Sequence, residues 1–199
     1  MNNIEQILHN KRKEIVRNKK DLPIEDLKRL IKNHTESDPL RSFRQAIDCG
    51  TLKIIAEIKR KSPSHGPVRM DLAVEDVAKT YDKSEHVACI SVLTDEEHFG
   101  CSLEDMRKAR AVTQKPILRK DFVLDGYQVY EAKAFGADAV LLIATVLAKE
   151  RIDIRPLVDL TFTLGMEPFV ECHKKEEVSS IPSNVKVIGV NNRDLYAKD

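Results

Sequence analysis

Acidic, basic and amide side chains stand near the ends of several short apolar runs in this sequence, where they could donate and accept protons. The stretch IIAEIKRKSPSHG carries Glu57 and Lys59, and later runs end near Lys120, Glu171 and Asn191. Carboxylates and ammonium groups that share a pocket can neutralise one another and remain available as general base and general acid. Whether these five side chains meet depends on the elements that carry them.

From residue 53 onward, short apolar runs alternate with amphipathic segments. The runs predict strands over 53–59, 86–93, 116–122, 137–144, 167–172 and 186–190. The segments between them predict helices over 72–83, 103–113, 127–135, 149–164 and, more briefly, 174–180. Such alternation predicts an α/β protein with a parallel sheet and helical crossovers. No G-x-G-x-x-G follows the first run, which favours a (β/α) barrel over a dinucleotide-binding fold.

The first fifty residues have a different character. Apolar residues recur there at mostly helical intervals, which predicts an N-terminal helical extension over 1–50 ahead of a barrel part over 51–199, in a single domain overall. Six of the ten residues from 11 to 20 are basic. Because no aromatic residue interleaves them as a base-stacking platform would need, they are interpreted as a solvated helix face rather than a nucleic-acid site.

Composition narrows the possible partners. The chain of 199 residues is 42% hydrophobic, and its 33 Lys and Arg nearly balance its 32 Asp and Glu, so no overall charge draws it to nucleic acid or to anionic lipid. The longest apolar stretch, 139–148, is shorter than the ~20 residues that span a bilayer. The N-terminus is polar and unlike a signal peptide, which predicts a cytoplasmic protein without membrane contact.

The four cysteines carry no recognisable site. Cys49, Cys89, Cys101 and Cys172 are widely and irregularly spaced, with no C-x-x-C, so we expect reduced thiols and no metal centre. Cys172 is followed by His173, but adjacent strand residues point to opposite faces, so the two should not form a thiolate–base pair.

Side-chain parity predicts which residues face the barrel interior. The helix-facing side of a barrel is expected to be continuously apolar, whereas polar residues at its carboxyl-terminal mouth are functional. In the first, fifth and sixth strands, every second residue is apolar and is expected to face outward. The residues between them would face the interior: Glu57, Lys59, Phe169, Glu171, Gly189 and Asn191. The third strand is less decisive: if Leu118 faces inward, so do Lys120 and Phe122. One such charge could simply reach solvent, but recurrence over four strands favours a shared cavity.

Five stretches of this sequence resemble the indole-3-glycerol phosphate synthase family. They are IIAEIKRKSPSHG, SVLTDEEHFG, PILRKDFVLDGYQVYEAKAFGADAVLLIATVL, GMEPFVECH and VIGVNNRDL. The resemblance implies a (β/α)8 TIM barrel that closes the pyrrole ring of 1-(2-carboxyphenylamino)-1-deoxyribulose 5-phosphate, releasing carbon dioxide and water. It is a carboxy-lyase reaction of tryptophan biosynthesis on a small phosphorylated substrate, and it implies no metal and no organic cofactor.

The resemblance also implies catalytic roles. Lys120 would be the acid that protonates the developing alkoxide, kept charged by proximity to Glu57 or Glu171. Glu171 would be the general base of the dehydration stage. Lys59 would bind the phosphate, while Glu57 and Asn191 would orient the lysines and the sugar hydroxyls.

Further residues match the family's binding pocket. Ser62 would lie beside the substrate, and Arg193 near the substrate carboxylate. Phe99, Phe122 and Leu141 would form the apolar pocket around the anthranilate ring, although core packing explains these three residues equally well.

The number of strands departs from the resemblance. Family barrels have eight, whereas only about six βα units are expected before Asp199. Three readings stay open: a fragment of a longer enzyme, a barrel completed by a partner such as a swapped dimer, or an inactive partial barrel that binds an anionic aromatic ligand or acts as an interaction partner. The first and sixth strands would be free edges that permit self-association. The sister family, phosphoribosylanthranilate isomerase, lacks the KRKSPS segment.

Overall fold

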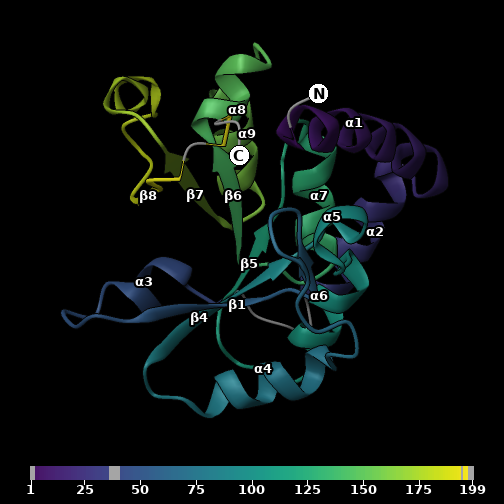
Figure 1. The fold of residues 1–199 in the computed structure, drawn as a ribbon, viewed down its shortest axis with the longest axis vertical. Coiled ribbons are helices and arrows are strands. Elements are labelled where there is room, and N and C mark those ends of the chain that lie inside the picture. Colours follow the sequence, from purple (N-terminus) through teal and green to yellow (C-terminus); the bar gives the residue numbers. More distant parts are fainter. Residues whose placement is uncertain (1–2, 36–40, 194, 197–199) are drawn as a thin grey trace.

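A curved parallel sheet organises the computed structural model, which describes residues 3–35, 41–193 and 195–196. The six strands paired in this sheet are β1 (Ile54–Ile58), β4 (Val87–Leu93), β5 (Ile117–Lys120), β6 (Ala139–Ile143), β7 (Glu167–Cys172) and β8 (Val187–Val190). They pair in chain order and every pairing is parallel. Figure 1 shows the row of strands curving from β1 and β4 to β8. The expected α/β fold, a partial (β/α) barrel, is therefore confirmed.

Helices connect the strands and cover the outer face of the sheet. The longer ones are α4 (Val74–Lys83), α6 (Leu103–Arg110), α7 (Gly126–Ala134) and α9 (Ile154–Thr163). Shorter elements follow individual strands: the hairpin β2 (Lys61–Ser62) with β3 (Gly66–Pro67), α5 (Glu96–Phe99), α8 (Ala144–Lys149) and the 3-10 helix η1 (Lys175–Ser180). The hairpin and α5 were not predicted from the sequence.

The boundary between strand and helix after β6 differs from the prediction. We expected the strand to run through residue 144 and a single helix to cover 149–164, but helix α8 begins at Ala144 and α9 only at Ile154. An unbroken apolar run does not distinguish a buried strand from a buried helix, which is why the prediction was wrong. Arg151, with a left-handed φ of 58°, lies between the two helices.

In the described residues before the sheet, three helices are present: α1 (Asn3–Asp21), α2 (Ile24–Thr35) and α3 (Phe43–Ile47). They confirm the helical character of the N-terminal segment, while its separation from residues 51–199 as an extension stays a proposal. In α1 the buried residues Ile4, Ile7, Leu8 and Ile15 form one apolar stripe. Figure 1 shows α1 and α2 beside α7. In α3, Phe43 packs against Phe169 of β7, with ring centroids 6.0 Å apart.

The two faces of the sheet have separate apolar clusters, and these test the parity prediction. Ile117, Val140 and Val170 pack outward against the helices, whereas Leu118 and Leu141 pack inward. Leu118 therefore faces the interior, which places Lys120 there as well. The prediction for the inner residues of β7 and β8 is also supported by Gly189, where an added Cβ would lie 2.6 Å from the Phe169 ring.

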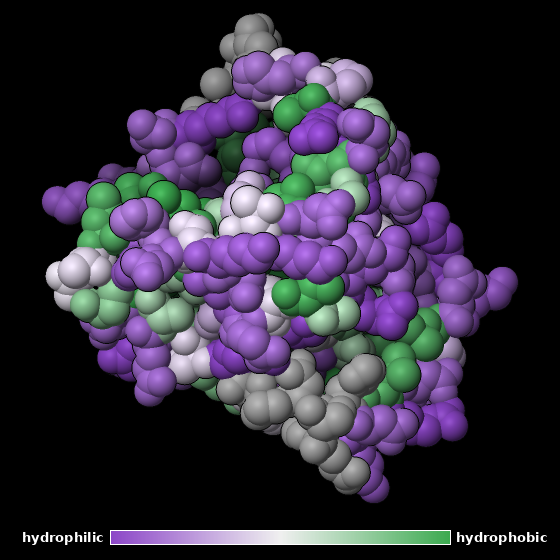
Figure 2. Space-filling view, turned by 90° about the horizontal axis from the view of Figure 1, so that it is seen from below, coloured by the Kyte–Doolittle hydropathy of each residue, from purple (hydrophilic) through white to green (hydrophobic). Residues whose placement is uncertain are grey.

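The outer faces of the edge strands are partly uncovered. Ile188 and Val190 of β8 are 46% and 88% exposed, and Ile54 of β1 is 53% exposed. Elsewhere the surface is mixed: Figure 2 shows a largely hydrophilic face with small, separated hydrophobic areas. No helix in the described part of the chain is long and apolar enough to cross a membrane.

Candidate active site

A cavity of about 520 Å³ lies at the carboxyl ends of the strands. Five of the polar residues that line it come from four strands or directly follow them: Glu57, Lys59, Lys120, Glu171 and Asn191. The structure thus brings together all five side chains with which the sequence analysis began. In a barrel this end of the sheet is where catalytic groups converge.

The residues expected to bind substrate surround the same cavity. Ser62 lines it from β2, Phe99 from α5, Phe122 from the turn after β5, and Arg193 from the segment after β8. Leu141 is fully buried and lies beside a small adjoining cavity of about 30 Å³, which it shares with both phenylalanines. These placements allow the two aromatic rings to contact a bound ligand directly and leave Leu141 behind them.

Ion pairs and hydrogen bonds join four of these five polar side chains in two pairs. Lys59 bonds to Glu57, and the Asn191 amide donates to Glu171 at 3.1 Å. The ammonium group of Lys120, by contrast, forms no hydrogen bond or ion pair with any described residue, and the expectation that proximity to Glu57 or Glu171 keeps it charged stays a prediction. The unpaired ammonium group is open to a ligand.

Several lining residues were missed by sequence reasoning. Ile4 and Ile7 of α1 form part of the cavity wall, as do His65 and Val68 near the β2–β3 hairpin. The helical stripe of α1 was recognised as apolar, but nothing in its spacing indicated that it would cover the strand ends. The N-terminal helix is therefore part of the site.

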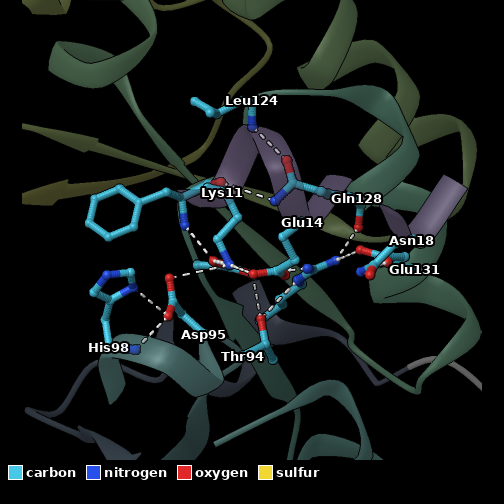
Figure 3. A network of polar contacts seen from close by, with 12 residues as sticks. Lys11, Glu14, Asn18, Thr94, Asp95, His98, Leu124, Gln128 and Glu131 are labelled. Carbon is cyan, nitrogen blue, oxygen red and sulfur yellow. Dashed lines mark hydrogen bonds and ion pairs between the residues drawn. The ribbon is translucent and has the colours of Figure 1, made fainter. Parts of the chain in front are cut away.

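Beside this cavity, Lys11 of α1 lies in a network of buried charges (Figure 3). Its ammonium group is 2.9 Å from Asp121, 3.3 Å from Asp95 and 2.9 Å from Glu14, and its side chain is fully buried. The expectation of a solvated basic face on α1 is wrong for this residue. Its position, four residues after Ile7, lies on the apolar stripe, and this spacing could have indicated burial.

A second buried cation, Arg119, lies on the helix-facing side of β5. Its guanidinium group bonds to Asp121 at 2.9 Å and to Glu131 of α7 at 3.1 Å, and it also donates to the Thr94 hydroxyl. The expectation of a continuously apolar outer face is therefore wrong for β5. Burial opposes ionisation of Asp121, but Lys11 and Arg119 outweigh it and lower the pKa of this carboxyl to about 2.

The network fixes the segments that carry site residues. Asp121 stands between Lys120 and Phe122, and its carboxylate accepts a 2.8 Å hydrogen bond from the Phe122 backbone N–H. Asp95 caps α5, the helix of Phe99, by accepting from the backbone N–H of His98 at 2.8 Å. Lys11 holds these two carboxylates together, so α1, the end of β4 and the end of β5 are tied to one another.

A parallel curved sheet with helices outside, and with acidic and basic side chains at its carboxyl-terminal end, defines an enzyme of the (β/α)-barrel class. A model of the family described as "Indole-3-glycerol phosphate synthase" matches residues 4–197. The protein of that name from Carboxydothermus hydrogenoformans is 42% identical over 197 residues, covering 96% of this chain and 74% of the relative. The one from Bacteroides thetaiotaomicron is 41% identical over 192 residues, covering 96% and 72%. The chain belongs to the indole-3-glycerol phosphate synthase family, whose members are carboxy-lyases of tryptophan biosynthesis.

Proposed function

We propose that the 520 Å³ cavity is the site at which this chain converts 1-(2-carboxyphenylamino)-1-deoxyribulose 5-phosphate to indole-3-glycerol phosphate. The observation that carries the proposal is that Lys120 and Glu171, from β5 and β7, line one cavity next to aromatic side chains. A cation and a carboxylate at the mouth of a barrel provide the acid and the base that this reaction needs.

Lys120 acts in the ring-closing step. The carboxylated carbon of the anthranilate ring attacks the ketone carbon of the sugar, and the electron pair of the C=O bond moves to oxygen. The ammonium group of Lys120 gives a proton to this developing alkoxide, forming a hydroxyl. Because this ammonium group bonds to no described residue, its protons can point at the ketone oxygen.

Glu171 acts after carbon dioxide has left. Loss of the carboxylate as carbon dioxide returns its bonding electrons to the ring, and the new hydroxyl must then leave as water. Before this step Lys120, left as a neutral amine by ring closure, takes up a proton from water. Glu171 then removes a proton from the ring carbon next to the one that carries the hydroxyl, the double bond of the pyrrole forms, and the hydroxyl departs as water with a proton from Lys120. A further proton from water restores the ammonium group. The amide of Asn191, 3.1 Å from the carboxylate, orients Glu171 for this transfer.

Lys59 and Arg193 bind the two anionic ends of the substrate. Lys59 is paired with Glu57 in the ligand-free site, so phosphate binding would exchange one anionic partner of Lys59 for another. Arg193 follows β8 at the other edge of the sheet, and it would face the carboxylate of the substrate. Phe99 and Phe122 would pack against the anthranilate ring, with Ser62 beside the sugar. Cytoplasmic location and self-association through β1 and β8 stay predictions.

The test is an assay of the purified chain with the carboxyphenylamino sugar phosphate. We expect indole absorbance and fluorescence to appear, with one carbon dioxide released for each product molecule. If the substrate raises the thermal midpoint of the protein but no product forms, the inactive, ligand-binding barrel is favoured instead. If neither product nor a shift of the midpoint is observed, both the catalytic and the ligand-binding readings are refuted. A coupled assay that starts from phosphoribosylanthranilate tests separately for the isomerase activity of the sister family.

A further inference from the structure

His173, directly after β7, is buried between the proposed base and a second cavity. Its side chain is only 6% exposed, and its Nε2 lies 3.5 Å from the Glu171 carboxylate. That nitrogen has no hydrogen-bond partner among the described residues although it is buried. Cys172, its neighbour, belongs to the outer apolar cluster, so the two side chains separate as expected.

The other ring nitrogen of His173 is fixed by a hydrogen bond. Nδ1 lies 3.0 Å from the hydroxyl of Thr145, and this hydroxyl donates its own proton to Glu177 at 2.6 Å. Although burial opposes ionisation of Glu177, hydrogen bonds from Thr145 and from the backbone N–H of His173 lower the pKa of this carboxyl. Since Glu177 takes the hydroxyl proton, Thr145 can only accept from the ring, which assigns the proton of the neutral imidazole to Nδ1.

This tautomer turns the lone pair of Nε2 toward Glu171. A lone pair facing a carboxylate is unfavourable, whereas one proton placed between the two atoms makes a hydrogen bond. We propose that His173 is a positioning residue that takes a proton from the Glu171 carboxyl at its Nε2 and passes it to solvent away from the substrate.

The proton balance of this relay is complete, and the relay rests on the proposed role of Glu171. Glu171 leaves the dehydration step as a carboxylic acid. Its O–H bond breaks as the Nε2–H bond forms, which restores the carboxylate and makes an imidazolium ion. The imidazolium then gives this proton to water, and the neutral ring is ready for another turnover.

The second cavity provides the route to water. It has a volume of about 330 Å³, is lined by His173 together with Thr145 and the exposed Asn192, and also touches Asn191 and Arg193 of the first cavity. The ionisable side chains that line it with His173 are Lys149, Lys174, Arg193 and Tyr196.

The exchange predicts a measurable link between His173 and Glu171 that does not depend on turnover. In histidine-labelled protein followed by NMR, the signal lost in His173→Gln identifies the ring. We expect the ¹⁵N signal of Nε2 to change in Glu171→Gln, because the carboxylate 3.5 Å from this nitrogen is gone. An unchanged Nε2 signal in Glu171→Gln would overturn the proposal, whether or not the protein shows activity.

Kinetics provides the second measurement. The amide of His173→Gln can hydrogen-bond to Glu171 but cannot carry a proton. We therefore expect kcat to fall ~10-fold with KM changed less than ~3-fold. His86→Gln, at an exposed position before β4, is the matched control and should retain wild-type kinetics. A folded His173→Gln enzyme with the wild-type kcat would contradict the relay.

Two further outcomes need their own interpretation: an unfolded His173→Gln variant, and a wild-type chain without activity. If His173→Gln unfolds, Thr145→Val keeps the imidazole but removes the acceptor for Nδ1–H, and we expect the same kinetic changes; wild-type kinetics in that variant would count against the proposal. If the wild-type chain forms no product, the proposed function fails, while the NMR comparison still decides whether Nε2 of His173 senses the Glu171 carboxylate.

Discussion

Lys120→Met lowers kcat/KM for the ring-closing reaction by at least ~10³-fold, since general acid catalysis contributes about 10²–10⁴-fold and the cation also stabilises the alkoxide electrostatically. The loss appears in kcat, because the proton is transferred only in the transition state. We expect the variant to keep or raise its thermal midpoint, since the ammonium group bonds to no described residue and methionine fits a cavity lined by phenylalanine and leucine side chains.

Two further variants separate the charge of Lys120 from its proton. Lys120→Arg keeps a cation that does not give up its proton, so activity should recover in part if electrostatics dominates and stay low if proton transfer dominates. Lys108→Met, on the exposed side of α6, removes a lysine outside the site and should be unaffected. Activity of Lys120→Met within tenfold of wild type would exclude Lys120 as the acid.

Lys11→Met destabilises the protein by about 3–5 kcal/mol, the range for removing one partner of a buried ion pair. Asp95 and Asp121 lose their shared cation although both side chains stay buried. Urea unfolding measures the effect. The matched control is Lys19→Met, also in α1, whose partner Asp125 is partly exposed, and it should cost below about 1 kcal/mol.

Charge repair and acid unfolding test the cause of this destabilisation. Asp95→Asn placed in the Lys11→Met background should recover part of the loss, because it removes a buried charge that has lost its partner. The pKa of Asp121 is depressed to about 2, so the stability it provides is present above pH ~4 and is lost as pH falls toward 2. Without Lys11 this pKa rises, and acid unfolding should begin at higher pH. Equal acid midpoints for the two proteins would contradict the role of Lys11.

The parallel sheet, and most of the side chains that meet at the carboxyl ends of its strands, could be predicted from the sequence. Period-two patterning in β1, β7 and β8 separated inner from outer residues, because the outer residues must pack against helices and the inner polar ones must not. Parallel strands end at one edge, so parity alone predicted that Glu57, Glu171 and Asn191 would lie together. For β5 the parity was ambiguous, and only the packing of Leu118 resolved it.

The partners of the buried charges could not be predicted in this way. Arg119 and Lys11 occupy positions that pattern analysis assigns to apolar or solvated residues, and each is tolerated only because carboxylates from other elements neutralise it. Such partners come from residues distant in sequence, such as Glu131 and Asp95. The proposed role of His173 was missed for the same reason, since it depends on Thr145 in helix α8, which was not predicted.

The most direct test of the central claim is a structure determined with a substrate analogue whose ketone is reduced to a hydroxyl, so that the ring cannot close. We predict that this hydroxyl lies within hydrogen-bond distance of Lys120 Nζ, about 3 Å. The carboxylate of Glu171 should face the same carbon atoms, and the anthranilate ring should pack on Phe99 and Phe122. An analogue bound outside the 520 Å³ cavity, or with its hydroxyl out of reach of Lys120, would contradict the account.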